Sequence, residues 1–94
     1  MFDVIVTRHH GLVDFLIKKG LASPTTAVVI HANASVVRGK KVCGVLPHSL
    51  SCLTESFTEI PLSLPLKKRG IELSADEIEK YAGEPITYTV RRTE

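Results

Sequence analysis

The fold is decided at residues 4–16, which spell VIVTRHHGLVDFL. The first residues are β-branched and apolar, which is typical of a buried strand, whereas Leu12, Phe15 and Leu16 are spaced as on one face of a helix. A strand that passes directly into a helix is the repeating unit of α/β proteins. The junction, residues 8–11, is Arg-His-His-Gly, although turn residues such as Asn, Asp, Ser and Pro are usual at such a position.

The rest of the chain alternates in the same way. Further strands are predicted at residues 26–30, 41–46, 57–62 and 84–92, the first strand at 2–7, and helices at 12–21, 47–56 and 74–83. Gly20 is the predicted C-cap of the first helix, and Ser74 with Glu77 forms a capping box. Short apolar strands interleaved with helices predict a mostly parallel sheet covered on both faces. The expected fold class is therefore α/β, a minimal Rossmann-like three-layer sandwich with a mostly parallel sheet of about five strands.

Size, charge and cysteine content narrow the class of protein. Ninety-four residues predict one domain, residues 1–94, with so little surface for a deep cleft that a site shared across a dimer is plausible. A net charge of +2 allows an anionic ligand but lacks the strong basic excess of proteins that bind long nucleic acids. Cys43 and Cys52 have no redox or zinc spacing and are expected to be buried, reduced thiols. No leader pattern or membrane span of about 18 apolar residues is found, so we expect a cytoplasmic protein with no membrane partner.

All four histidines follow predicted strands. His9 and His10 follow the first strand, His31 the second and His48 the third. In a parallel sheet these positions share the carboxyl edge, where open α/β sheets bind ligands. The first and third strands are commonly neighbours in such sheets. We therefore expect the loops that follow them to face each other: residues 7–11, TRHHG, and residues 46–49, LPHS.

Each of these loops opens a helix, whose free N–H groups and dipole suit a phosphate. Arg8 adds a bidentate donor, and His10 and His48 add donors or a general acid. We therefore predict Arg8, His10 and His48 as catalytic residues and a ligand-binding set of Thr7, His9, Gly11, His31, Leu46, Pro47 and Ser49. Structural alternatives remain: Arg8 pairing with Asp3 or Asp14, Ser49 acting as a helix cap, and His31 being a solvated surface residue.

The sequence lacks the residue patterns that other common catalytic mechanisms require. No carboxylates are expected in the edge loops and no histidine pair has helical spacing, so we predict neither a metal nor another cofactor. A Ser-His-Asp triad lacks its nucleophile elbow, and no phosphate-binding glycine-rich loop is present. The Arg-His-Gly loop of histidine phosphatases is a rival, but a second histidine precedes Gly11, the chain is about half the length of such a domain, and no second essential histidine is evident.

Four segments together carry a resemblance to a known family. In order they are VTRHHGLVDFL, GVLPHSLSCL, IPLSLPLKKRGIELSADEIEKY and TYTVRR, which cover nearly the whole chain. They resemble the CRISPR-associated Csx-sixteen family, whose members carry an Arg-His loop after strand one, a Leu-Pro loop after strand three and a similar stretch before the last helix. His10 stands where many relatives have Pro, so the loops correspond more closely than the individual catalytic residues.

The resemblance implies a function. Members accompany type III CRISPR systems and are regarded as ring nucleases, which cleave cyclic oligoadenylate, chiefly cyclic tetra-adenylate, and so switch off antiviral signalling. It implies a CARF-like homodimer in which loops 7–11 and 46–49 face the ring. Arg8 would hold a phosphate while His10 or His48 moves protons during attack by the 2′-OH, leaving linear products with 2′,3′-cyclic phosphate ends. The alternative is a protein that binds the same ring without cleaving it and so senses or sequesters it.

Overall fold

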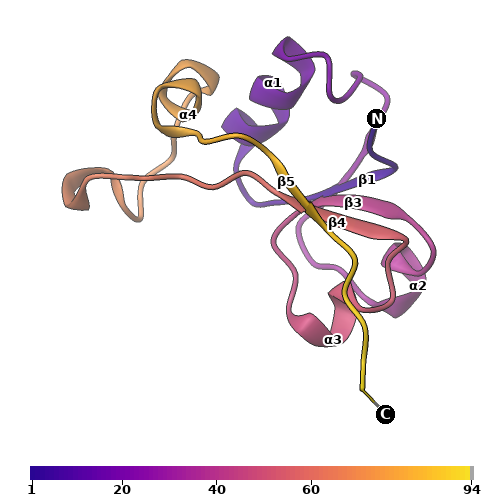
Figure 1. Ribbon diagram of the computed structural model, residues 1–94. Helices are drawn as coiled ribbons and strands as arrows, with labels where there is room; N and C mark the ends of the chain where they lie inside the picture. Colours follow the sequence, from indigo (N-terminus) through magenta and orange to yellow (C-terminus); the bar gives the residue numbers. More distant parts are fainter. Residues whose placement is uncertain (94) are drawn as a thin grey trace.

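Five strands form one sheet in the computed structural model, which describes residues 1–93 (Figure 1). They are β1 (Val4–Val6), β2 (Ala27–Val29), β3 (Lys41–Gly44), β4 (Ser56–Glu59) and β5 (Ile86–Tyr88), in the order β2-β1-β3-β4-β5. The first four are parallel and β5 is antiparallel to β4. The mostly parallel sheet and the pairing of β1 with β3 are thus confirmed, although each strand is shorter than predicted.

Helices cover both faces of the sheet. They are α1 (His10–Lys18), α2 (Ala34–Val37), α3 (His48–Ser51) and α4 (Ala75–Tyr81), with a 3-10 turn η1 (Leu66–Lys68). Ile5 packs with Phe15 of α1 and Ile78 of α4 on one face. Val4 and Val6, whose side chains alternate with that of Ile5, pack with α2 on the other face. Figure 1 shows the resulting three layers, which confirm the expected sandwich.

The ends of the longer helices follow the predicted signals. Gly20 has a φ of +74° just after α1, and the N–H of Leu21 reaches back to the carbonyl of Leu16 at 2.9 Å. At the start of α4, the Ser74 hydroxyl accepts from the N–H of Glu77, and the Glu77 carboxylate accepts from the N–H of Ser74, each at 3.2 Å. The capping box is therefore present as predicted.

Two local expectations were wrong. Ser49 does not cap a helix: α3 begins at His48 after Pro47, so Ser49 lies inside a single turn. Cys43 is fully buried, but Cys52 is only partly buried, because α3 is one turn long and Cys52 follows it at the surface. None of the helices described is long and apolar enough to cross a membrane.

The C-terminal strand also differs from its prediction. Apolar and polar residues alternate at 86–91, a pattern typical of a strand with one face exposed to solvent, yet all three residues of β5 are exposed. β5 lies at the edge of the sheet, where Tyr88 is 41% exposed. Its inward contact is made by Thr87, whose hydroxyl lies 2.8 Å from that of the buried Thr58.

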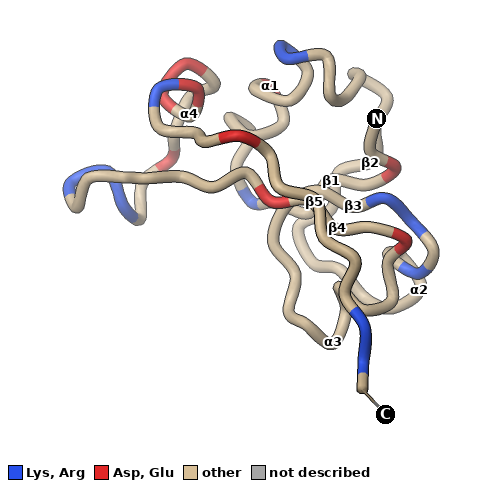
Figure 2. The backbone as a smooth tube through the Cα atoms, viewed as in Figure 1, with Lys and Arg blue, Asp and Glu red and all other residues tan. Residues whose placement is uncertain are grey.

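Residues 61–73 form an arm that leaves the sheet after β4 and returns at α4 (Figure 1). Two contacts hold the arm to α4 and the residue after it: a bridge joins Leu62 near its start to Ala82, and Lys68 in η1 donates to the carboxylate of Glu77 at 2.8 Å. Figure 2 shows that its tip, around η1, carries basic residues well away from the sheet. Apart from η1, the arm contains neither helix nor named strand.

Candidate functional site

The carboxyl edge of the sheet collects the predicted site loops. Val6 of β1 lies beside Gly44 of β3, and the N–H of Val45 donates to the carbonyl of Val6 at 3.1 Å. Gly44 has a φ of +132°, and a Cβ there would collide with the Val6 backbone, so only glycine lets the two strands come this close. The loops at 7–11 and 45–49 therefore begin side by side, as expected.

Arg8 lies in a hollow of about 360 Å³ with Thr7, His9, Ile30 and Val45. No ion pair joins Arg8 to Asp3 or Asp14 within the described residues. Asp3 instead accepts from the N–H of Lys41 at the other end of β3. The ion pair considered as an alternative for Arg8 is therefore not formed, and Arg8 is exposed at the hollow.

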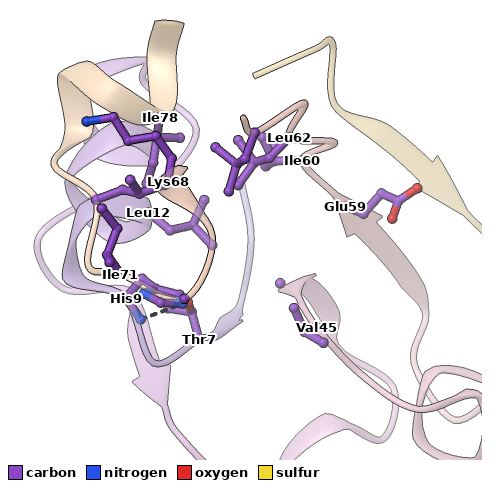
Figure 3. Close-up of a pocket in the computed structure, with 14 residues that line it drawn as sticks. Thr7, His9, Leu12, Val45, Glu59, Ile60, Leu62, Lys68, Ile71 and Ile78 are labelled. Atoms are coloured by element: carbon purple, nitrogen blue, oxygen red, sulfur yellow. Dashed lines mark hydrogen bonds between the residues drawn. The ribbon is translucent and has the colours of Figure 1, made fainter. Parts of the chain in front are cut away.

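His9 joins the first loop to the arm. It is the N-cap residue of α1, and its N–H donates to the Thr7 hydroxyl at 3.1 Å, as Figure 3 shows. Its Nδ1 lies 3.5 Å from the carboxylate of Glu72 in the arm, and both side chains are more than half exposed. His9 thus has a local partner, and an exposed pair of this kind contributes little to stability.

A cleft of about 240 Å³ opens between the arm and α1. In Figure 3, Leu12 and Ile71 line one side, Ile60 and Leu62 the other, and His9 lies at one end beside Thr7. We call this space the arm cleft. Its walls are mainly apolar, which suits a hydrophobic group better than a phosphate.

The next two residues occupy the first turn of α1. His10 is exposed, and its side chain makes no hydrogen bond or ion pair to the described residues. Gly11 is buried, and a Cβ on it would occupy the space of the Leu73 carbonyl group. His10 is thus open to a ligand, whereas Gly11 lets the end of the arm pack on α1.

The loop after β3 contributes to two further hollows. His48 and Ser49 line one of about 470 Å³ with Arg91 and Arg92, which follow β5. His48 and Leu46 line another, of about 380 Å³, between α3 and β5. Pro47 is exposed as the N-cap residue of α3, and His31 is exposed just beyond β2.

The structure thus brings the predicted residues together in two sets. Thr7, Arg8 and His9 share one hollow, while Leu46, His48 and Ser49 line the hollows around α3. The sets lie on adjoining hollows, because Val45 lines both the Arg8 hollow and the arm cleft, and Glu59 lines both the arm cleft and the α3–β5 hollow. Arg8 and His48 therefore line different hollows.

Several residues of this edge were missed. Glu59 is the last residue of β4, so the rule that placed the histidines applies to it, but the predicted strand ran to residue 62 and hid it. The edge therefore does carry a carboxylate. Tyr88 donates to Glu59 at 2.8 Å, and this hydrogen bond raises the pKa of the tyrosine. Arg91 and Arg92 carried no sequence signal, because only the path of the chain after β5 brings them to α3.

Among residues 1–93, no group of three or more His, Cys, Asp and Glu side chains is arranged to hold a metal ion.

The fold defines a class: small α/β proteins with a mostly parallel sheet, whose carboxyl edge here carries imidazole and guanidinium groups as a candidate ligand site. Residues 4–91 match the model of the family described as "Putative CRISPR-associated protein (Cas_VVA1548)", and the chain belongs to that family. The CRISPR association that the sequence resemblance implied is confirmed. No curated protein and no solved structure matches the chain.

Proposed function

We propose that this protein is a metal-independent ring nuclease that cleaves cyclic oligoadenylate, chiefly cyclic tetra-adenylate, and so ends a type III CRISPR signal. The observation that carries the proposal is the gathering of Arg8 and the histidines at the carboxyl edge of the sheet in a chain of a CRISPR-associated family. Its support is chemical: an anionic ring of RNA needs groups that hold phosphate and groups that move protons.

The RNA supplies its own nucleophile. The 2′-OH attacks the adjacent phosphorus when the backbone is held in line, the bond to the 5′ oxygen breaks, and a 2′,3′-cyclic phosphate forms. The protein then has to fix that geometry and stabilise the charge that develops on the phosphate. The proton of the 2′-OH passes to water or to a neutral imidazole, and a protonated imidazole gives a proton to the departing 5′ oxygen.

Arg8, His10 and His48 take these roles in the proposal. Arg8, which makes no ion pair among the described residues, holds the phosphate through its guanidinium. His10 or His48 protonates the 5′ oxygen, since both are exposed at the edge and neither has a described ion-pair partner. His9 is less suited, because it already lies beside Glu72.

The spacing of the hollows favours a ring over a mononucleotide. Arg8 and His48 line different hollows along the edge, which an extended ligand reaches at more than one nucleotide. A homodimer with a two-fold axis would present two equivalent sites to opposite linkages of a four-membered ring. Light scattering after gel filtration tests this part: the proposal expects twice the 10.3 kDa mass of one chain, and a mass of one chain contradicts it.

Cleavage is tested with cyclic tetra-adenylate in EDTA, the products being resolved by chromatography. Linear fragments with 2′,3′-cyclic phosphate ends support the proposal. Bound but intact ring indicates the alternative, a binding protein without turnover, and release of inorganic phosphate from a monoester, with no ring binding, indicates a phosphatase.

Variants then assign the roles. His10→Ala or His48→Ala, whichever removes the general acid, lowers kcat by about a hundredfold or more with little change in ring affinity. Arg8→Ala lowers both affinity and kcat. Arg38→Ala is the matched control, because Arg38 follows α2 just before β3, at the opposite edge of the sheet. If the Arg8, His10 and His48 variants are all as active as the wild type, the assignment is wrong.

A further inference from the structure

A second feature of the carboxyl edge is the hollow of about 380 Å³ between α3 and β5. Leu46, Phe57 and Val90 give it apolar walls, and Tyr88 adds an aromatic ring. Its polar groups include Glu59 and His48. The volume lies near the lower end of the range of about 300–1,000 Å³ for small-ligand sites, and the lining mixes apolar side chains with polar ones.

The strand register explains why Glu59 and Tyr88 meet there. Phe57 pairs with Tyr88 and Glu59 with Ile86, so Glu59 and Tyr88 are diagonal neighbours on the face that carries Phe57. Phe57 packs with the cluster on the α2 and α3 side of the sheet. In Figure 3 the Glu59 carboxylate points away from the arm cleft, toward β5.

Tyr88 fixes the orientation of the carboxylate. Its hydroxyl donates to Oε1 of Glu59 at 2.8 Å. An ionised carboxylate offers about four lone-pair sites, so Glu59 keeps acceptors for a ligand after this bond is made. The hollow therefore combines a fixed acceptor with an aromatic ring, and its negative charge disfavours a phosphate.

We propose that this hollow is a nucleobase site that takes a base with an exocyclic amino group, with Glu59 accepting from the amino group and Tyr88 positioning the carboxylate. Resting on the proposed function, the base is one adenine of the oligoadenylate. Aromatic side chains bind bases by stacking, which is tolerant of sequence, whereas a hydrogen bond to the base edge supplies selectivity.

The neighbouring surface suits the rest of a nucleotide. His48 and Val90 line both this hollow and the adjoining one, which also contains Arg91 and Arg92. Figure 2 shows these basic residues on the chain that runs from β5 past α3. A base bound beside Glu59 thus has cationic side chains within the next hollow to meet its phosphate.

The test compares two linear trinucleotides by isothermal titration calorimetry. One is tri-adenylate, and the other carries purine bases that lack the amino group but has the same backbone charge. The proposal expects the full-length protein to bind tri-adenylate about tenfold more tightly, the value of one hydrogen bond to a charged acceptor at a half-exposed site. Binding that is equal for the two probes, or absent for both, overturns it.

Matched variants locate the selectivity. Glu59→Ala, which removes the acceptor, abolishes the preference for adenine, and Tyr88→Phe reduces it while keeping the ring for stacking. Tyr88→Ala weakens both probes together. Glu55→Ala is the control, because Glu55 precedes β4 at the opposite edge and pairs with Lys41, so the tenfold preference persists in it. A preference that survives in Glu59→Ala overturns the proposal.

The outcome is separable from the nuclease activity. Cleavage of cyclic tetra-adenylate without any preference between the two trinucleotides retains the proposed function and overturns the nucleobase site. A preference for adenine without cleavage of the ring retains the site and overturns the nuclease.

Discussion

Replacement of Gly11 by alanine distinguishes a packing role from a ligand-binding role at this position. Gly11 is the second residue of α1, and the carbonyl group of Leu73, at the end of the arm, fills the space that a Cβ would need. Elsewhere in a helix the same substitution stabilises a protein by about 1 kcal/mol, because alanine is the better helix former. At Gly11 the added methyl group must displace backbone.

The expected effect is a net loss of stability. Overpacking of this kind costs about 1–3 kcal/mol, and the upper end applies because a backbone carbonyl cannot rotate away as a side chain can. Subtracting the helix gain leaves a destabilisation of about 2 kcal/mol, or a fall in Tm of roughly 10 °C for a domain of this size.

Urea unfolding followed by circular dichroism measures the free energy, and hydrogen exchange in the arm shows where the strain falls. Gly39→Ala is the control: it has open space around the missing Cβ and a φ of +70°, so it costs about 1 kcal/mol of backbone strain without loosening the arm. If Gly11→Ala is as stable as the wild type, the packing explanation is wrong. A variant that is as stable as the wild type but no longer binds the ring would show that Gly11 serves ligand binding instead of packing.

Three further predictions concern thiols, acid and the capping box. Burial raises the pKa of Cys43 to about 12. Iodoacetamide is therefore expected to label only Cys52 in the native protein and both thiols in urea. Rapid labelling of both thiols in the native protein would contradict the buried position of Cys43. The hydrogen bond from Lys68 lowers the pKa of Glu77 below its usual 4.5, so the pair contributes stability above that pH and loses it as the pH falls through the lowered value. Glu77→Gln, which can still complete the capping box, is therefore less stable than the wild type at pH 7 and equal to it in strong acid; an undiminished difference in acid would argue against the ion pair. Ser74→Ala removes the N-cap of α4 and costs about 1 kcal/mol in urea unfolding, whereas Ser35→Ala, whose hydroxyl donates to Asn33 on the surface, changes little; equal losses would dismiss the capping box.

The architecture followed from local patterns that need no long-range information. The strand at β1, the glycine after α1 and the capping box at Ser74 each have a short-range signature, and their alternation predicts a parallel sheet. Strand ends were less predictable. Ile60 and Leu62 continue the apolar pattern of β4, yet Ile60 packs against the core and Leu62 pairs with Ala82 after the strand has ended.

Only those residues of the candidate site that directly follow a strand could be predicted from the sequence. Arg8 and His10 follow β1, and His48 follows β3, because the predicted strands and their order are those of the structure; the role of these residues as a site stays a prediction. Strand order alone does not predict that the arm places Glu72 beside His9. Nor does it predict that the residues after β5 place Arg91 in one hollow with His48. The ion pair of His9 with Glu72 and the shared hollow of His48 and Arg91 both depend on irregular segments, whose path no periodic pattern encodes.

The central claim is that the carboxyl edge of the sheet binds cyclic oligoadenylate. Titration of ¹⁵N-labelled protein with cyclic tetra-adenylate, followed by amide chemical shifts in EDTA, tests it most directly. The account predicts shifts concentrated at residues 7–10, 45–49 and 59, with little change at Asp3, Lys40 and Glu55 on the opposite edge. Shifts confined to the opposite edge, or no shifts at all, would contradict it.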